Sequence, residues 1–193
     1  MNAKSVALCS MFVALAVLLA RITIPVGPIS LYFWEIPIVI ALLLFGNRFG
    51  FTVAVISVFT QALVFPRSMG LLFPVWNLIA MSTTLAAIAL IRWFFCHKIS
   101  ETKYKAKSEK RMLIGFVAAA LLLRVGIMPF VDYFMYKFML PIFIGQAYTD
   151  TYIMGLMSFI LVYNTVLTLY TVPTSYTIAR KLNQSLKIST TFV

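Results

Sequence analysis

The stretch LLFPVWNLIAMSTTLAAIALIRWFF, residues 71–95, decides the fold class of this sequence. Its only charged side chain is Arg92, close to its end, and a strongly basic segment at 98–111 follows. A helix needs roughly 20 predominantly apolar residues to cross the hydrocarbon core of a bilayer. We therefore expect a transmembrane helix here, with a polar loop after it.

Similar segments lie on both sides of this stretch, at residues 4–22, 34–47, 49–65, 112–128 and 153–180. The chain of 193 residues is 62% hydrophobic and 11% charged, with a mean hydropathy of +0.98. A soluble domain is usually about half apolar and about a quarter charged. The sequence therefore predicts an all-α protein, a single domain (residues 1–193) of six transmembrane helices in one compact bundle.

Two of the segments have features of their own. The segment at 34–47 is short and carries Pro37, so we expect it to lie against protein more than against lipid. Residues 129–152 are apolar but interrupted by charged, proline and glycine residues. We expect the fifth helix to continue past a kink at Pro129, followed by a segment that caps the outer face.

The positions of the basic residues predict the orientation. A net charge of +11 could indicate nucleic-acid binding, but most of the Lys and Arg residues flank apolar segments. Six spans with an internal N-terminus place twelve of the 16 basic residues inside and leave Arg21, Arg67, Arg124 and Lys137 outside. Cytoplasmic loops of membrane proteins carry such an excess. We therefore expect both termini in the cytoplasm, no nucleic-acid partner, and contact with membrane lipid.

The sequence lacks the usual parts of an intramembrane enzyme. It has no His-Glu-x-x-His, no Gly-x-Ser-x-Gly, no paired intramembrane aspartates and no glycine-rich phosphate loop. Cys9 and Cys96 have neither metal-ligand nor disulfide-framework spacing. We expect no enzyme activity, no metal and no permanently bound cofactor, so that any ATP used would bind to another subunit. Two alternatives stay open: an enzyme acting on lipid or isoprenoid head groups through Arg124, Asp132 and Glu35, and a lone channel or assembly protein.

Polar side chains inside the predicted helices indicate where a ligand could bind. Asn77 and Asn164 lie in the fourth and sixth segments, each about 10–17 Å from the outer surface at ~1.5 Å per residue. Polar groups at such depth are costly and usually face a bundle or a cavity. Ligand binding and interhelical hydrogen bonding both remain open for these amides, whereas for the row of threonines below Asn164 we favour interhelical bonding. Arg124 lies in an apolar helix and needs a partner, for which Asp132 is one candidate.

The first segment carries a stripe of small side chains, Ala3, Ala7, Ser10 and Ala14. Small residues at helical spacing allow another backbone to approach closely. The stripe could serve packing inside the bundle or docking of a partner protein in the membrane, and the pattern leaves both open.

Three stretches together resemble one family. They are ISLYFWEIPIVIALLLFGNRFG (29–50), FPVWNLIAM (73–81) with Asn77, and FILVYNTVLTLYTVPTSY (159–176) with Asn164. In this order they resemble the S components of energy-coupling-factor (ECF) transporters, the vitamin-capturing subunits of bacterial and archaeal uptake systems. The landmarks are Glu35–Pro37 and Phe45–Gly50, and the small-residue stripe is similar to the surface that docks on the scaffold subunit.

The resemblance implies a ligand, partners and a location. The riboflavin branch looks closest, although Ser30 stands in place of its threonine, Pro74 in place of an acidic residue and Leu167 in place of a lysine. A vitamin or related heterocycle, with riboflavin the leading candidate, would be taken up with a scaffold (T) subunit and two ATPase subunits in the plasma membrane of a prokaryote. The predicted substrate-binding residues are Ser30, Tyr32, Trp34, Glu35, Trp76, Asn77, Arg124, Asp132, Tyr163 and Asn164.

Overall fold

The computed structural model describes residues 3–26, 29–66, 70, 72–98, 105–145 and 147–186. Its elements in chain order are α1 (Ala3–Leu19), β1 (Thr23–Val26), β2 (Ile29–Tyr32), α2 (Glu35–Phe45), α3 (Asn47–Val64), α4 (Leu72–Lys98), α5 (Lys105–Phe134), the π-helix η1 (Met135–Met139), α6 (Leu140–Ile144) and α7 (Asp150–Leu186). Each of the six predicted apolar segments forms a helix. The two short strands pair antiparallel, with Pro25 opposite Ser30.

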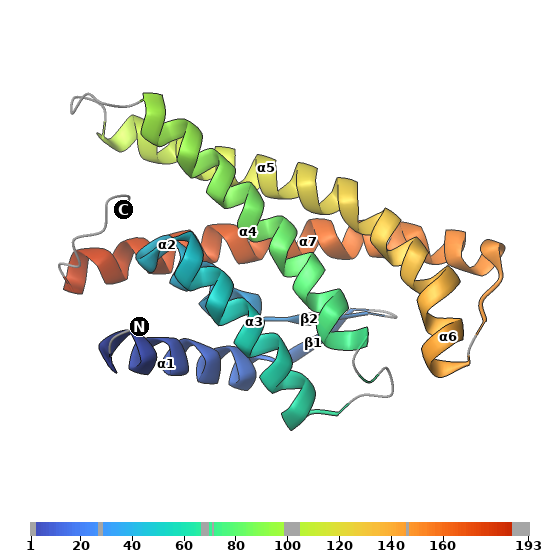
Figure 1. Ribbon diagram of the computed structural model, residues 1–193. Coiled ribbons are helices and arrows are strands. Elements are labelled where there is room, and N and C mark those ends of the chain that lie inside the picture. The colour runs from blue at the N-terminus through green and yellow to red at the C-terminus, as the bar shows by residue number, and fades with distance from the viewer. Residues whose placement is uncertain are drawn as a thin grey trace.

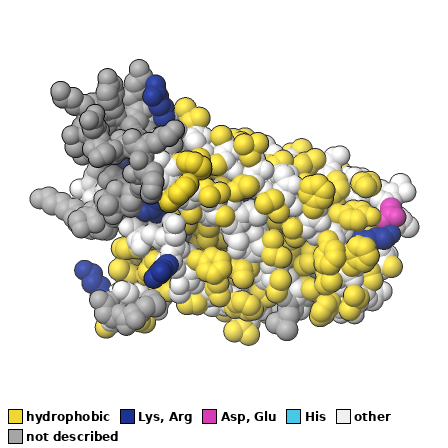
Figure 2. All heavy atoms as spheres, turned by 45° about the horizontal axis from the view of Figure 1, so that its top comes forward, with side chains coloured by type: hydrophobic (Ala, Val, Ile, Leu, Met, Phe, Trp, Pro, Cys, Tyr) yellow, Lys and Arg dark blue, Asp and Glu magenta, His cyan; other side chains and the backbone are white. Residues whose placement is uncertain are grey.

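Figure 1 shows how the helices are arranged. The start of α1, the end of α4, the start of α5 and the end of α7 all lie at one end of the molecule, whereas α6 lies at the other. Figure 2 shows dark blue Lys and Arg side chains gathered mainly at the first of these ends. The fold therefore brings the basic segments together on one side, and that this side faces the cytoplasm stays a prediction.

The exterior between the two ends is apolar. Hydrophobic side chains cover the middle of the face drawn in Figure 2, and Leu63, Leu122 and Phe130 are 83%, 76% and 78% exposed. Large contiguous apolar surfaces are rare on soluble monomers, which indicates that lipid covers this one. Within the described residues, four helical segments are long and apolar enough to cross a membrane: Asn47–Val64, Leu72–Phe94, Lys110–Ile144 and Asp150–Ser185. The apolar helices α1 and α2 are shorter.

Helix α2 is surrounded by protein. Every residue from Glu35 to Leu44 is buried, and the helix packs against α1, α3 and α7. It turns into α3 through Gly46, which has a φ of +95° that favours glycine. A Cβ at Gly50 of α3 would meet the Cα of Leu42 at 2.7 Å, so the close approach of the two helices requires glycine there. The prediction that this segment lies against protein is confirmed.

The segment at 129–152 begins as a continuation of α5. Helix α5 runs through Pro129, passes into the π-helix η1 and then α6, and ends at Gly145 with a φ of +73°. Leu72, Met135 and Leu140 form a small buried cluster that joins this region to the start of α4. The continuation past Pro129 is confirmed, whereas the π-helix was not anticipated.

Candidate ligand-binding site

A cavity of about 250 Å³ lies where β2, α2, α4, α5 and α7 meet. Every predicted substrate-binding residue except Ser30 lines it. Its lining residues are Tyr32, Trp34, Glu35, Phe73, Trp76, Asn77, Ala80, Arg124, Met128, Asp132, Tyr136, Ile160, Tyr163 and Asn164. A concave site with aromatic walls and a few fixed polar groups is typical of small-molecule binding.

The centre of the site is a buried ion pair. Arg124, 2% exposed, donates from Nη1 to Glu35 Oε2 at 2.6 Å and from Nη2 to Oε1 at 2.8 Å. Its Nε donates to Asn164 Oδ1 at 2.9 Å, and Nη1 also donates to Thr84 Oγ1 at 3.1 Å. The planar guanidinium suits this two-point contact with a carboxylate. One arginine thus links α2, α4, α5 and α7.

The partner of Arg124 differs from the candidate that sequence spacing favoured. Asp132 lies two turns further along α5, but its Oδ1 accepts a hydrogen bond from Trp76 Nε1 instead. Glu35 is the first residue of α2 and is 1% exposed, so the end of a buried helix presents its carboxylate to α5. This correction follows from tertiary packing, which sequence spacing along one helix does not contain.

The two amides that were left open have different surroundings. Asn164 uses both of its polar atoms inside the protein, because its Oδ1 accepts from Arg124 and its Nδ2 donates to Ile160 O at 3.0 Å. Asn77 is half-buried, lines the cavity, and has no side-chain hydrogen-bond partner within the described part of the chain. Asn164 therefore positions Arg124, whereas the amide of Asn77 is free to meet a ligand.

The charges and rings of the cavity limit what it can hold. Its charged lining residues are Glu35, Arg124 and Asp132, which together carry a formal charge of −1. Across the residues that the structure describes, Asp132 is 3% exposed and forms no ion pair. The Trp76 and Tyr136 rings meet edge to face at 5.3 Å. A flat ligand with hydrogen-bond donors suits these walls.

The β1–β2 hairpin closes one side of the cavity. Tyr170 Oη donates to the carbonyl of Tyr32, and the ring of Tyr170 lies 5.6 Å from that of Phe33. These contacts tie the hairpin to α7. Ser30, predicted to bind substrate, does not line the cavity, because it lies two residues further from α2 than Tyr32, about 6–7 Å along the strand.

The comparison with known proteins identifies the family. The family described as "ECF transporter, substrate-specific component" matches residues 4–188. The chain belongs to this family. It is therefore a substrate-binding transport subunit of a multi-pass membrane type, not an enzyme, and the lipid-modifying alternative is not favoured.

Solved structures agree with this S-component fold. One, described as the S component of a bacterial ECF transporter, is 21% identical with a TM-score of 0.71, covering 95% of this chain and 98% of that one. Another, ThiT from Listeria monocytogenes, is 17% identical with a TM-score of 0.57 and 96% coverage of each chain. At these identities the likeness shows the fold alone. A search of the curated proteins gave no match.

Several lining residues of this S component were not predicted as binding residues, although the sequence contained a signal for them. Each is three or four residues from a predicted one on the same helix, or, for Tyr136, on its π-helical continuation, so it belongs to the same side. They are Phe73 and Ala80 near Trp76 or Asn77, Met128 near Arg124, Tyr136 near Asp132, and Ile160 near Asn164. Extending each predicted residue by one helical turn would have found most of the site.

The polar row below Asn164 packs inside the S component. Thr168 donates to the carbonyl of Asn164 in its own helix at 2.8 Å, and Ser175 donates across to Ile36 O of α2 at 3.3 Å. Thr171 Oγ1 is buried without a partner in the part that the structure describes. In the described residues neither threonine makes the interhelical hydrogen bond that we favoured; in this row that bond is made by Ser175, and none of these side chains lines the cavity.

The small-residue stripe of α1 faces outward. Ala3, Ala7, Ser10 and Ala14 are all exposed, whereas Cys9, Phe12, Val13 and Ala16 on the other side of the helix are buried. The structure thus removes packing inside the bundle as an explanation for the stripe. Docking of a partner remains.

Proposed function

We propose that this S component captures a vitamin or related heterocycle from outside the cell and passes it on for ATP-driven uptake. The observation that carries the proposal is the convergence of the predicted residues, from four helices and a hairpin, on one aromatic cavity around a buried ion pair. Riboflavin is the leading candidate ligand because the sequence resembles that branch of the family.

The chemistry of the cavity supports a ring-containing ligand that donates hydrogen bonds. The carboxylate of Asp132 can accept hydrogen bonds from a ligand. The free side-chain amide of Asn77 can donate to a ring carbonyl or accept from a ring N–H. Arg124 is already neutralised by Glu35, so an anionic ligand gains little from it. Riboflavin meets these demands through its ring imide and its hydroxylated side chain.

The proposed partners are those of an ECF transporter. A scaffold (T) subunit would dock on the exposed stripe of α1, with Ala7 near its centre, and two ATPase subunits would bind and hydrolyse the ATP. Small side chains let a partner helix approach closely. In this proposal the protein sits in the plasma membrane of a prokaryote with its basic end in the cytoplasm, and it holds no permanent cofactor of its own.

The test is a binding titration on the purified protein in detergent. Riboflavin is added while flavin and tryptophan fluorescence are followed, and mass spectrometry identifies any molecule that co-purifies. Asp132→Asn and Asn77→Ala should each weaken binding roughly tenfold, since a lost hydrogen bond to a buried group is worth about 1–3 kcal/mol. Asn47→Ala, an exposed amide at the other end of α3 from the ligand side, is the matched control.

The outcomes separate the ligand from the function. Binding of another heterocycle with the same dependence on Asp132 would replace riboflavin and keep the proposed function. If no heterocycle binds or co-purifies, or if Asn47→Ala weakens binding as much as Asn77→Ala, the proposed capture in this cavity is wrong.

A further inference from the structure

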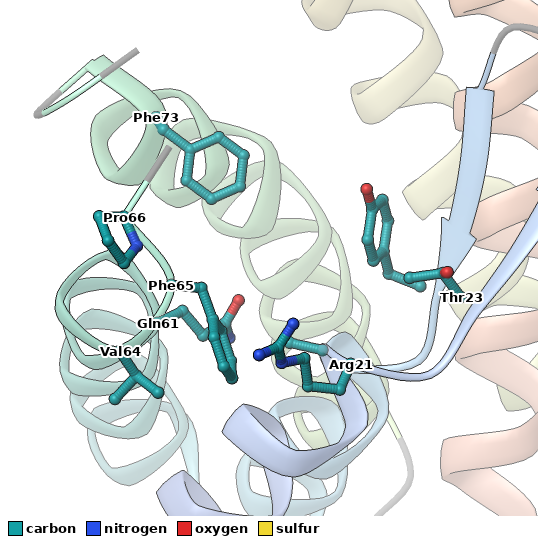
Figure 3. Close-up of a pocket in the computed structure, with 9 residues that line it drawn as sticks. Arg21, Thr23, Gln61, Val64, Phe65, Pro66 and Phe73 are labelled. Carbon is teal, nitrogen blue, oxygen red and sulfur yellow. The ribbon is translucent and has the colours of Figure 1, made fainter. Parts of the chain in front are cut away.

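A second cavity of about 490 Å³ lies beside the first and is shown in Figure 3. It is bounded by the end of α1, the β1–β2 hairpin, the end of α3 and the start of α4. Its lining residues are Ala20, Arg21, Thr23, Tyr32, Gln61, Val64, Phe65, Pro66 and Phe73. Tyr32 and Phe73 line both cavities, so they form the wall between them.

A residue with an unpaired amide nitrogen, Gln61, lines this second cavity. Gln61 is only 5% exposed, and its Nε2 has no hydrogen-bond partner within the residues that the structure describes. Figure 3 shows the Gln61 side chain directed toward Arg21. A buried donor without an acceptor is costly, and such groups in native proteins call for an explanation. A bound acceptor supplies one here.

The charge of the second cavity is opposite to that of the first. Among the residues that the structure describes, Arg21 is the only charged one in its lining, and it contributes a formal charge of +1. The guanidinium carbon lies 4.1 Å from the centre of the Phe65 ring, which holds the group in place from one side. In the described ranges Arg21 forms no ion pair with a carboxylate. Its hydrogen-bond donors are available to a ligand.

We propose that this second cavity binds an anionic group, a phosphate or a carboxylate, between Arg21 and Gln61. Both residues supply N–H donors, and arginine is well matched to two oxygens of one anion. A cation would be repelled by Arg21, and a purely apolar molecule would leave the Gln61 amide unpaired. The group could belong to a soluble anion or to a lipid head group, because the neighbouring Leu63 and Val64 are exposed apolar residues.

Two binding measurements on the protein in a phosphate-free maltoside detergent test the proposal and separate the two sources. One titrates inorganic phosphate and acetate by calorimetry, and the other measures retention of phosphatidylglycerol by native mass spectrometry. Arg21→Gln and Gln61→Leu should each weaken binding roughly tenfold or more in at least one measurement. The measurement that responds identifies the source.

The control variants separate binding from folding. Arg48→Gln removes the same charge from an exposed residue at the other end of α3 and should leave binding unchanged. Gln61→Leu removes an unpaired buried amide, so its thermal unfolding midpoint should stay the same or rise while binding falls. The proposal is overturned if the unmodified protein binds neither phosphate, acetate nor lipid, or if Arg48→Gln loses as much binding as Arg21→Gln.

Discussion

The buried ion pair between Glu35 and Arg124 gives the sharpest stability prediction. Glu35→Gln keeps the shape of the side chain but removes the only carboxylate that pairs with Arg124 in the described structure. The guanidinium would then stay buried with neutral partners, Asn164 and Thr84. A buried charge without a counter-charge strongly lowers the free energy of unfolding.

The expected magnitude follows from the burial of the pair. The two side chains are 3% and 1% exposed, and removing one partner of a buried pair costs about 3–5 kcal/mol. For a chain of this length about 1 kcal/mol lowers the unfolding midpoint by roughly 2–4 °C, so a fall of about 6–20 °C is expected. Tryptophan fluorescence during heating in detergent measures the unfolding midpoint.

A second ion pair in the same protein serves as the control. Lys137 and Asp150 also lie 2.6 Å apart, but their side chains are 34% and 60% exposed. Surface pairs contribute little, so Asp150→Asn should leave the midpoint almost unchanged. The double variant Glu35→Leu/Arg124→Met, which removes both charges, should be more stable than Glu35→Gln alone. Equal losses for Glu35→Gln and Asp150→Asn, or a double variant no more stable than Glu35→Gln, would refute the reasoning.

Three further predictions concern packing, orientation and docking. Gly50→Ala should destabilise the protein by about 1–3 kcal/mol because α2 leaves no room for a methyl group. Gly155→Ala, in open space on α7, should not, and the unfolding midpoints of the two variants test this difference. In a cysteine-free background, Lys110→Cys should react with an impermeant thiol reagent only after cells are opened, and Ala147→Cys in intact cells; the reverse pattern would invert the proposed topology. Ala7→Trp should leave the unfolding midpoint unchanged and abolish co-purification with the scaffold subunit, and retained co-purification would exclude the stripe as the docking surface.

Much of the fold could be predicted because it depends on local composition. The long apolar segments, the basic residues between them and the short proline-bearing segment around Pro37 each reflect one element and its solvent. Helix α7 nevertheless runs to Leu186, beyond the predicted end at 180, because Arg180 and Lys181 favour helix and its last turns need no apolar surroundings. The boundary followed intrinsic propensity more than hydropathy.

The features that were missed depend on which helices lie side by side. Sequence spacing shows that Arg124 and Asp132 share a helix, and it suggested that they pair. The actual partner, Glu35, is 89 positions away, and only the packing of α2 against the rest of the bundle brings it near. The π-helix at Met135–Met139 could not be predicted either, because the wider turn does not change the hydropathy pattern of an already apolar segment.

The complete burial of α2 has a consequence for how the nascent chain matures. Helix α2 is synthesised early, yet one of the surfaces that covers it belongs to α7, which is synthesised after the other described helices. Until then the surface of α2 that packs against α7 is uncovered. Glu35 also lacks its ion-pair partner, because Arg124 is synthesised 89 residues later. The packing around α2 can therefore be completed only after α5 and α7 have been synthesised, so assembly of the bundle follows insertion of the first helices.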